Sequence, residues 1–305
     1  MKKMGAAGIM MPFLSHAGIP FANPNEPLEI HVFSKHLQFL DYKAAAEAAA
    51  EIGFNGMDLT VRPKGHVLPE NVATDLPKAI QHIKDAGLTC RMITTAVSDA
   101  EDATDQQIIK TASDQGVKYY RSNWFRYDKE KPLEESLAFY QQKVSELSQL
   151  NKEHDIIGAY QNHSGLHIGA SYWELKKIVE TANPEYFGIQ YDIRHAVAEG
   201  GNSWPNGVKL LRQNIKTIAL KDFIWGKSDG KWKPINVPIG EGMVDFKSYF
   251  GLLKKYGIKP PVSMHYEYPL GGAEKGRYEI KVDKKVVFDA MKKDLMAIQK
   301  IWETA

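Results

Sequence analysis

Five short polar stretches hold the side chains of this sequence that could do chemistry. They read RPKGH at 62–66, QNH at 161–163, YDIRH at 191–195, LKD at 220–222 and HYEY at 265–268. Side chains alternate along a strand, so residues two apart, such as Gln161 with His163 and His265 with Glu267, point the same way. Carboxylates, imidazoles and an ammonium group together suit proton transfer, and the carboxylates and imidazoles also suit a divalent cation. The stretches predict one polar pocket, provided that the fold brings them together.

The elements that must position these stretches repeat one unit along the chain. A helical segment ends at Gly or Asn and is followed by an apolar, β-rich run, as in YKAAAEAAAEIGFNGMDLTV, PKAIQHIKDAGLTCRMITTAV and QQIIKTASDQGVKYYRSNW. Gly53, Gly87 and Gly116 stand where a helix C-terminus favours a residue that tolerates a left-handed conformation. Pro77 stands where the first turn of a helix accepts a missing N–H.

The same unit continues to the end of the chain and predicts a barrel. It places helices over 133–154, 172–182, 206–213 and 246–257, with a first strand at 29–35 and a last helix at 284–303. Helices and strands that alternate about every thirty residues are typical of parallel strands with right-handed crossovers. The prediction is an α/β protein, a single-domain (β/α)8 TIM barrel over 28–305, with its active site at the C-terminal ends of the strands. The irregular segment 223–244 is expected to be a loop over the barrel mouth.

Composition and charge exclude several classes of function. The 39 basic and 37 acidic residues are mixed along the sequence and give a net charge of +2, so no basic stripe is offered to nucleic acid. No GxGxxG follows the first strand, and no GxxxxGK[ST] occurs. Cys90 is the one cysteine, which excludes an intramolecular disulfide framework and a thiolate metal cage. Nucleic acid is therefore disfavoured as a partner, and a homo-oligomer stays open.

The N-terminus predicts a leader over residues 1–22. Lys2 and Lys3 precede the apolar run MGAAGIMMPFL, and SHA follows at 15–17, a pattern typical of a secretory signal peptide. The apolar run is too short to span a bilayer stably. With a signal peptide the protein would work in the periplasm or outside the cell. The alternative is a disordered or surface-docked leader on a cytoplasmic protein.

The strand-end motifs, taken in order, resemble a known family. DIRHA, LKDF, PIGEGMVDF and HYEY are similar to the corresponding motifs of the sugar isomerase/epimerase family built on the xylose isomerase-like TIM barrel, and the likeness runs from residue 28 to near the end. The resemblance implies one divalent metal, Mn, Mg, Zn or Co, held by Glu, Asp, His and Glu from strands five to eight. That metal polarises a sugar carbonyl while carboxylates move the proton on the adjacent carbon.

This chain keeps only part of the metal-ligand set that the resemblance implies. Asp192 and Glu267 match two ligands, whereas Gln161 and Ala219 stand where the family has Glu and His. Gln161 can offer a neutral oxygen to a hard cation but brings no charge and cannot act as a base. A rebuilt metal site would use Asp192, Glu267, His265 and Gln161. Metal binding therefore stays an open expectation.

Without a metal, the same side chains predict acid–base catalysis. Glu267 or His265 would be the general base, and Lys221 or His163 would supply the positive charge that stabilises an enolate. His195 matches the companion of the strand-six Asp in the family and is a further catalytic candidate. Loss of a carboxylate at Gln161 favours one-base enolisation or elimination over epimerisation by two opposed groups.

The expected substrate contacts come from several strand ends. They are His66, Arg121, Asn123, His163, His195 and Trp225. Several have a structural alternative: His66 as a loop residue with a backbone partner, Arg121 in an ion-pair network of the barrel, and His195 as a cap of the turn after strand six.

Three functions compete on this sequence. The leading one is a carbohydrate isomerase, epimerase or lyase that abstracts a proton next to a sugar carbonyl. The second is a barrel that has lost its chemistry and binds a sugar or oligosaccharide without turnover. The third, hydrolysis of DNA by an endonuclease IV-like relative, is disfavoured because that chemistry needs a multi-metal cluster and a basic surface.

Overall fold

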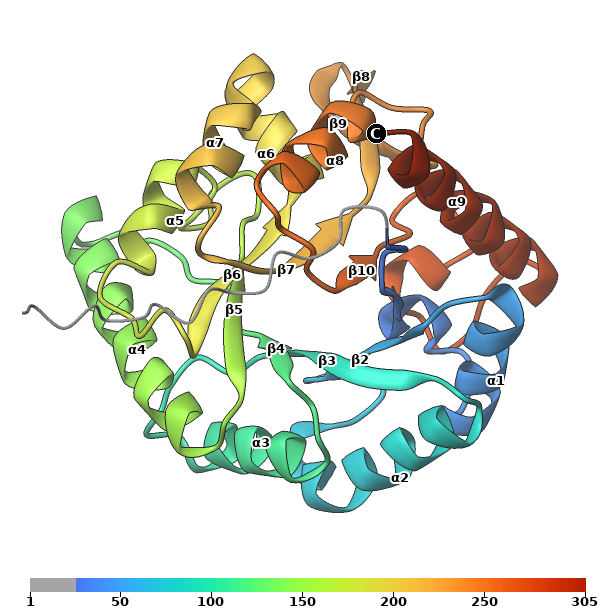
Figure 1. Cartoon of the computed structure of the whole chain (residues 1–305), viewed down its shortest axis with the longest axis horizontal. Coiled ribbons are helices and arrows are strands. Elements are labelled where there is room, and N and C mark those ends of the chain that lie inside the picture. Colours follow the sequence, from blue (N-terminus) through green and yellow to red (C-terminus); the bar gives the residue numbers. More distant parts are fainter. Residues whose placement is uncertain (1–25) are drawn as a thin grey trace, which may run out of the picture.

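Parallel strands joined by helices form a closed barrel in the computed structural model, which describes residues 26–305 (Figure 1). Around the barrel the strands follow the order β1, β10, β7, β6, β5, β4, β3, β2. Their bounds are β1 Ile30–Phe33, β2 Gly56–Val61, β3 Thr89–Thr95, β4 Tyr119–Arg121, β5 Ile157–Gln161, β6 Phe187–Asp192, β7 Ile215–Leu220 and β10 Val262–Met264. The predicted single-domain TIM barrel is confirmed. The leader expected over 1–22 lies outside the described residues.

Helices cover the outside of the barrel, as Figure 1 shows. The α-helices are α1 Tyr42–Ile52, α2 Val72–Asp85, α3 Ala103–Asp114, α4 Leu133–Glu153, α5 Tyr172–Ile178, α6 Ile193–Gly200, α7 Trp204–Leu211, α8 Phe246–Lys255 and α9 Lys284–Thr304. Short 3-10 turns are η1 Ser34–Leu37, η2 Pro69–Asn71, η3 Gly201–Ser203 and η4 Ala273–Lys275. None of the helices in the part of the chain that the structure describes is both long and apolar enough to cross a membrane.

The sequence fixes the helix ends through local caps. The Asp41 side chain accepts a hydrogen bond from the Ala44 N–H at the start of α1, and Gly53, with φ 109°, ends that helix in a left-handed conformation. Asp102, Ser171 and Asp245 cap α3, α5 and α8 in the same way. A side-chain oxygen at the N-cap satisfies one of the N–H groups that the first turn leaves unpaired.

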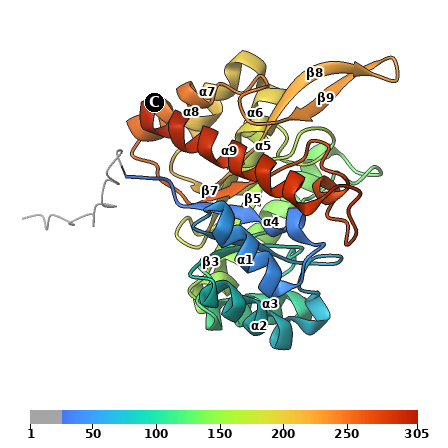
Figure 2. The same ribbon diagram turned by 90° about the vertical axis from the view of Figure 1, so that its right-hand side faces the viewer.

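Two local predictions were wrong. Pro77 lies inside α2, because that helix already begins at Val72, directly after the η2 turn. The segment expected to be an irregular loop at 223–244 contains instead an antiparallel hairpin, β8 Asp222–Ser228 with β9 Lys231–Val237. Asp229 and Gly230 form its turn with φ 52° and 74°, the left-handed pair that a tight hairpin requires. Figure 2 shows the hairpin reaching out beyond the helices.

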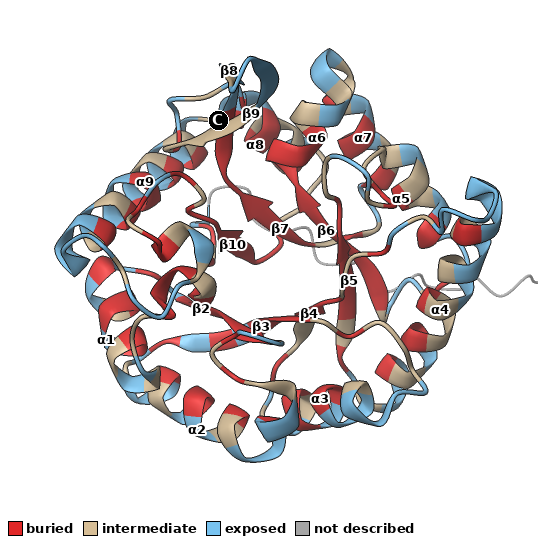
Figure 3. Ribbon diagram, turned by 180° about the vertical axis from the view of Figure 1, so that it is seen from behind, coloured by how far each residue is buried: buried red, intermediate tan, exposed pale blue. Residues whose placement is uncertain are grey.

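The core lies between the strands and the inner faces of the helices. Figure 3 shows buried strands inside a ring of helices whose outer faces are exposed. Every residue of β1, β2 and β6 is buried, as expected for parallel strands covered on both faces. Because all the barrel strands are parallel, their C-terminal ends open at one end of the barrel, which is the mouth.

Candidate active site

Strand register brings the predicted polar residues together at the mouth. Asp192, the last residue of β6, lies beside Ala219 of β7, which in turn lies beside Ser263 of β10. Lys221 directly follows β7, and Glu267 follows β10. Residues that are far apart in the sequence therefore meet within a few ångströms.

The ammonium group of Lys221 lies between two carboxylates. Its Nζ is 3.3 Å from Oδ2 of Asp192 and 3.1 Å from Oε2 of Glu267. Lys35, which follows β1, adds a second cation with Nζ 3.4 Å from Oε1 of Glu267. Lys221 and Asp192 are buried, while the Glu267 side chain keeps 24% of its surface exposed. Glu267 is therefore the carboxylate of this group that a ligand can reach.

These charges set the protonation of both carboxyl groups. Burial alone would raise the pKa of Glu267, but Lys221 and Lys35 outweigh it and hold that pKa well below its usual value. Burial raises the pKa of Asp192, against the opposing effect of Lys221. Burial likewise lowers the pKa of Lys35, although Glu267 opposes the shift. Glu267 is consequently ionised at neutral pH.

Gln161 uses both ends of its amide group inside the protein. Its Nε2 donates to Oδ2 of Asp192 at 2.8 Å, and its Oε1 accepts from Nη1 of Arg121 at 3.1 Å. The neighbouring Asn162 also bonds to Asp192, donating to its carbonyl oxygen and accepting from its N–H. The QNH stretch thus orients the strand-six aspartate.

As they stand, the side chains do not fit a divalent metal ion. The oxygen of Gln161 faces Arg121, and Lys221 occupies the space between Asp192 and Glu267. Ala219 supplies no donor atom. Over residues 26–305 no group of three or more His, Cys, Asp or Glu side chains is placed to hold a metal ion. The positive charge at this position belongs to the chain itself.

The hydrogen bonds of His195 define which of its nitrogens carries the proton. Nδ1 accepts from the backbone N–H of Ser164 at 3.2 Å and from Nη1 of Arg194 at 3.0 Å, and it lies 2.8 Å from Oγ of Ser164. The proton must therefore sit on Nε2, which is 3.7 Å from Oδ2 of Asp192. Burial, helped by Lys221, holds the pKa of His195 well below 6.5, so the ring is neutral.

His163 is also neutral but offers a lone pair. Its Nδ1 lies 2.8 Å from the carbonyl oxygen of Ser164, so Nδ1 donates and Nε2 is free to accept. Burial and Lys221 lower its pKa to about 4. The ring packs against those of Trp124 and His195, with centroids 4.7 and 4.1 Å away. A neutral ring supplies no positive charge, which leaves Lys221 for that role.

His265 is a buried ring next to Glu267. Its ring stacks on Phe33 with centroids 4.3 Å apart, its Nε2 lies 3.1 Å from Oγ of Ser263, and its Nδ1 lies 4.0 Å from Oε1 of Glu267. Burial, followed by Lys221, keeps the pKa of His265 well below 6.5. This buried neutral ring lies beside Glu267 without a hydrogen bond to it.

The remaining predicted contacts are divided between the mouth and other regions. Arg121 and Asn123 line the mouth beside Trp124. His66 lies 3.1 Å from Oγ of Ser34 through its Nδ1 and sits among apolar side chains between β2 and helices α1 and α2. Trp225 is 43% exposed on the hairpin. The structure thus brings Arg121 and Asn123 to the site and leaves His66 and Trp225 outside the cluster around Lys221.

Several side chains of the candidate site were not singled out by sequence reasoning. They are Lys35, Arg62, Ser164 and Arg194. Arg62 directly follows β2 and Lys35 is the second residue after β1, so the strand-end rule that identified Lys221 would have found them. Ser164 and Arg194 carry no such signal, because their roles depend on the position of His195.

Asp222, next to Lys221, builds the loop that follows the hairpin. Its carboxylate accepts hydrogen bonds from the backbone N–H groups of Phe223, Gly240, Gly242 and Val244. A Cβ at Gly242 would overlap Oδ1 of Asp222. Asp222 of the LKD motif and Gly242 of the PIGEGM motif therefore form a structural pair that shapes the loop. Lys221, in contrast, faces the mouth.

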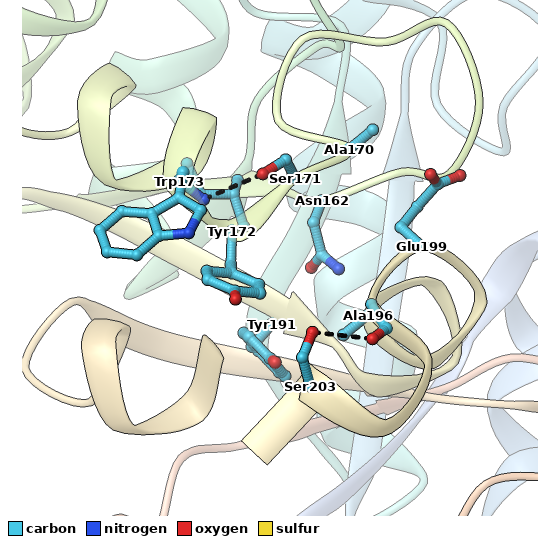
Figure 4. Close-up of a pocket in the computed structure, with 11 residues that line it drawn as sticks. Asn162, Ala170, Ser171, Tyr172, Trp173, Tyr191, Ala196, Glu199 and Ser203 are labelled. Carbon is cyan, nitrogen blue, oxygen red and sulfur yellow. Dashed lines mark hydrogen bonds between the residues drawn. The ribbon is translucent and has the colours of Figure 1, made fainter. Parts of the chain in front are cut away.

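A separate hollow of about 160 Å³ is lined by residues that follow β5 and by residues of α5, β6 and α6. Figure 4 draws the side chains that line it. Tyr172, Tyr191 and Asn162 line it, next to the exposed ring of Trp173. Glu199 at its rim accepts from the N–H of Gly165 and so fixes the loop that carries Ser164. The residues that line this hollow pack next to the ends of β5 and β6, outside the barrel.

Comparisons with known proteins agree with the architecture. A family model described as xylose isomerase-like TIM barrel matches residues 46–282. No curated protein sequence matches the chain. Similar solved structures include the probable 3-DHS dehydratase AsbF from Bacillus anthracis, at 13% identity and a TM-score of 0.63 over 89% of this chain and 98% of that one. At this identity the likeness establishes the fold.

Two further structures show the same fold. The 3-keto-D-glucoside 4-epimerase YcjR from E. coli is 12% identical with a TM-score of 0.62, over 88% of this chain and 99% of that one. The IOLI protein, solved with a bound zinc atom, is 19% identical with a TM-score of 0.65, over 88% of this chain and 99% of that one.

Proposed function

Because the chain belongs to the xylose isomerase-like TIM barrel family, we propose that it is a carbohydrate-modifying enzyme that removes a proton next to a sugar carbonyl. In this proposal the ammonium of Lys221 supplies the positive charge that the family resemblance assigns to a metal. The observation that carries it is the position of Lys221 Nζ, 3.3 Å from Asp192 and 3.1 Å from Glu267.

Lys221 is suited to stabilising an enolate. An ammonium group has three N–H donors, and with two turned towards Asp192 and Glu267 one remains for a substrate carbonyl oxygen. Negative charge develops on that oxygen as the adjacent C–H bond breaks. A fixed cation in a poorly solvated site stabilises this charge more strongly than water does, and it needs no reorganisation.

Glu267 is the proposed base. It is ionised at neutral pH and partly exposed, whereas the oxygens of Asp192 are taken up by Gln161, Lys221 and the N–H of His195. The cations that keep Glu267 ionised also make it a weak base. Proton transfer to it therefore depends on stabilisation of the enolate by Lys221, which couples the two residues in one step.

His163 is the second proton-transfer group in this proposal. It follows the end of β5, with β6 and β7 between it and the β10 end that carries Glu267, and its Nε2 is the nitrogen left to accept a proton. For epimerisation Nε2 would first take up a proton from solvent and then return it to the opposite face of the enolate, whereas loss of a neighbouring hydroxyl group, protonated by Glu267, would give elimination. Product analysis distinguishes these two outcomes of the same enolate.

Hydrogen exchange in D2O tests the proposal. Keto sugars are incubated with the protein, and loss of the C–H signal next to the carbonyl is followed by NMR. We expect exchange with the wild type, a loss of about 1,000-fold in Glu267→Gln, and no change in the exposed control Glu303→Gln. Sugar binding without exchange in the wild type would support instead the barrel that binds a carbohydrate without turnover.

A further inference from the structure

The charged side chains around the main cavity at the mouth are all basic. This cavity has a volume of about 420 Å³ and is lined by Lys35, Arg62, Lys64, Arg121 and Lys275, together with neutral residues that include Asn123 and Trp124. No acidic side chain of the described chain belongs to its lining. Its volume lies within the usual range for small-molecule sites and leaves room for a monosaccharide.

Arg121 is buried in this lining without an anionic partner. Only 4% of its surface is exposed, and its hydrogen bonds go to two neutral oxygens, Oε1 of Gln161 and the carbonyl of Thr95. Its Nε and the indole Nε1 of Trp124 are buried N–H donors with no acceptor among residues 26–305. A buried cation with unpaired donors is costly unless a ligand completes its hydrogen bonds.

Arg62 adds a second guanidinium to the same cavity. It lies over the Phe33 ring at 5.5 Å. Burial lowers its pKa, against the attraction of Asp58 and Glu267. Burial and the nearby Arg62 lower the pKa of Arg121 to about 9, so both groups are still cationic at neutral pH. Two mutually repelling guanidinium groups that face one cavity indicate an anionic occupant.

One buried acid, Asp58, offsets part of the charge of these arginines. Asp58 lies inside the barrel, and its oxygens accept hydrogen bonds from Thr94 and Ser263. Burial raises the pKa of Asp58 to about 6. One carboxylate against two guanidinium groups leaves positive charge in the cavity for a ligand.

We infer that this cavity binds an anionic group of the substrate, a carboxylate or a phosphate, held by Arg62 and Arg121 beside Trp124. Guanidinium groups match the paired oxygens of both anions. Lys35 connects the cavity to the site, because it lines the cavity and lies 3.4 Å from Glu267. The substrate is then an acidic sugar with its reacting carbonyl at Lys221. That placement rests on the proposed function, whereas anion binding itself does not.

Calorimetric titration tests this inference without requiring turnover. The probes are D-glucuronate, D-glucose 6-phosphate and D-glucose, each titrated at low and at high ionic strength. We expect at least one anionic sugar to bind ten-fold or more tightly than glucose, with a preference that weakens in salt. The tighter of the two anions identifies the acid group.

Matched variants assign the preference to the cavity. Arg62→Gln and Arg121→Gln should each abolish it, and Arg212→Gln, which removes an exposed arginine, should keep it. Arg62 is less buried than Arg121, so Arg62→Gln provides the test should Arg121→Gln fail to fold. Failure of both anions to bind, equal binding of glucose, or a preference retained in Arg62→Gln would overturn the inference. Anion binding without hydrogen exchange would contradict only the proposed function.

Discussion

Nζ of Lys221 and Oε2 of Glu267 lie 3.1 Å apart, on segments that follow the adjacent strands β7 and β10. This ion pair holds a cation and a base side by side at the barrel mouth. Its geometry leads to the first of five predictions.

Replacing Lys221 by Met should lower the rate of hydrogen exchange by about 100- to 1,000-fold, because the enolate loses its stabilising cation. The variant also leaves Asp192 and Glu267 without the charge between them, so the pKa of Glu267 should rise. Exchange followed by NMR measures the first effect, and carboxyl titration measures the second. Lys300→Met, an exposed lysine on α9, is the matched control. Wild-type exchange in Lys221→Met would remove the basis of the proposed function.

Removal of divalent metals should leave exchange unchanged. The oxygen of Gln161 is bonded to Arg121, and Lys221 stands between the two carboxylates, so no set of donors is left for an ion. Elemental analysis of protein purified without a chelating tag should find no stoichiometric Mn, Mg, Zn or Co, before or after Asp192→Asn. One ion per chain that is lost in this variant would contradict the proposed role of Lys221.

The acid limb of the pH–rate profile should respond to Lys35. Glu267 must be ionised to act as the base. Because Lys221 and Lys35 hold its pKa well below 4.5, the base is lost only as the pH falls through that depressed value. Lys35→Met removes part of the effect, so the acid limb should move to higher pH. An acid limb at the same pH in Lys35→Met and wild type would show that Glu267 does not set it.

Stability should fall when the pH drops from 6.5 towards 4. Burial lowers the pKa of His31 and of His66 to about 4 and that of His36 to about 3. The unfolded chain binds protons at these sites first, so each costs up to about 1.4 kcal/mol per pH unit in that window. Urea unfolding at pH 7 and pH 5 measures the slope. His36→Asn should reduce it, whereas the control His82→Gln should keep the wild-type slope.

A further stability comparison isolates the loop held by Asp222. Gly242→Ala should cost about 2 kcal/mol, because its Cβ would overlap Oδ1 of Asp222 and disturb the backbone hydrogen bonds that this carboxylate accepts. Gly251→Ala in α8 meets open space and should stabilise the protein by about 0.5–1 kcal/mol. Equal effects of the two variants on the unfolding midpoint would contradict this account of the loop.

The sequence predicted the barrel because its signals are local. Gly53 ends α1 in the expected left-handed conformation, and α4 and α9 fall close to their predicted bounds. The hairpin was missed although Asp229 and Gly230 form a well-known turn pair, because apolar and polar residues do not alternate clearly along its two strands. Helix α6 was missed because Asp192 is at once the last residue of β6 and the N-cap of that helix.

The site was harder to predict than the fold. Asp192, Lys221 and Glu267 could be identified from strand ends, and the structure brings them into contact. The orientation of Gln161 depends on Arg121 and Asp192, which are remote in sequence. The protonation of His163 and His195 depends on burial and on Lys221. Such properties arise only from tertiary packing, so a single sequence does not contain them in readable form.

The placement of Lys221 has a thermodynamic consequence. A metal cofactor obeys mass action: its occupancy depends on the free concentration of the ion and on its dissociation constant, and it is diluted away when supply is short. A cation that is covalently part of the chain has an occupancy of one per site in every compartment. With Lys221 in this role, the activity of the protein would be independent of the metal supply of its surroundings, and the strand-end lysine would be present from the moment the barrel folds.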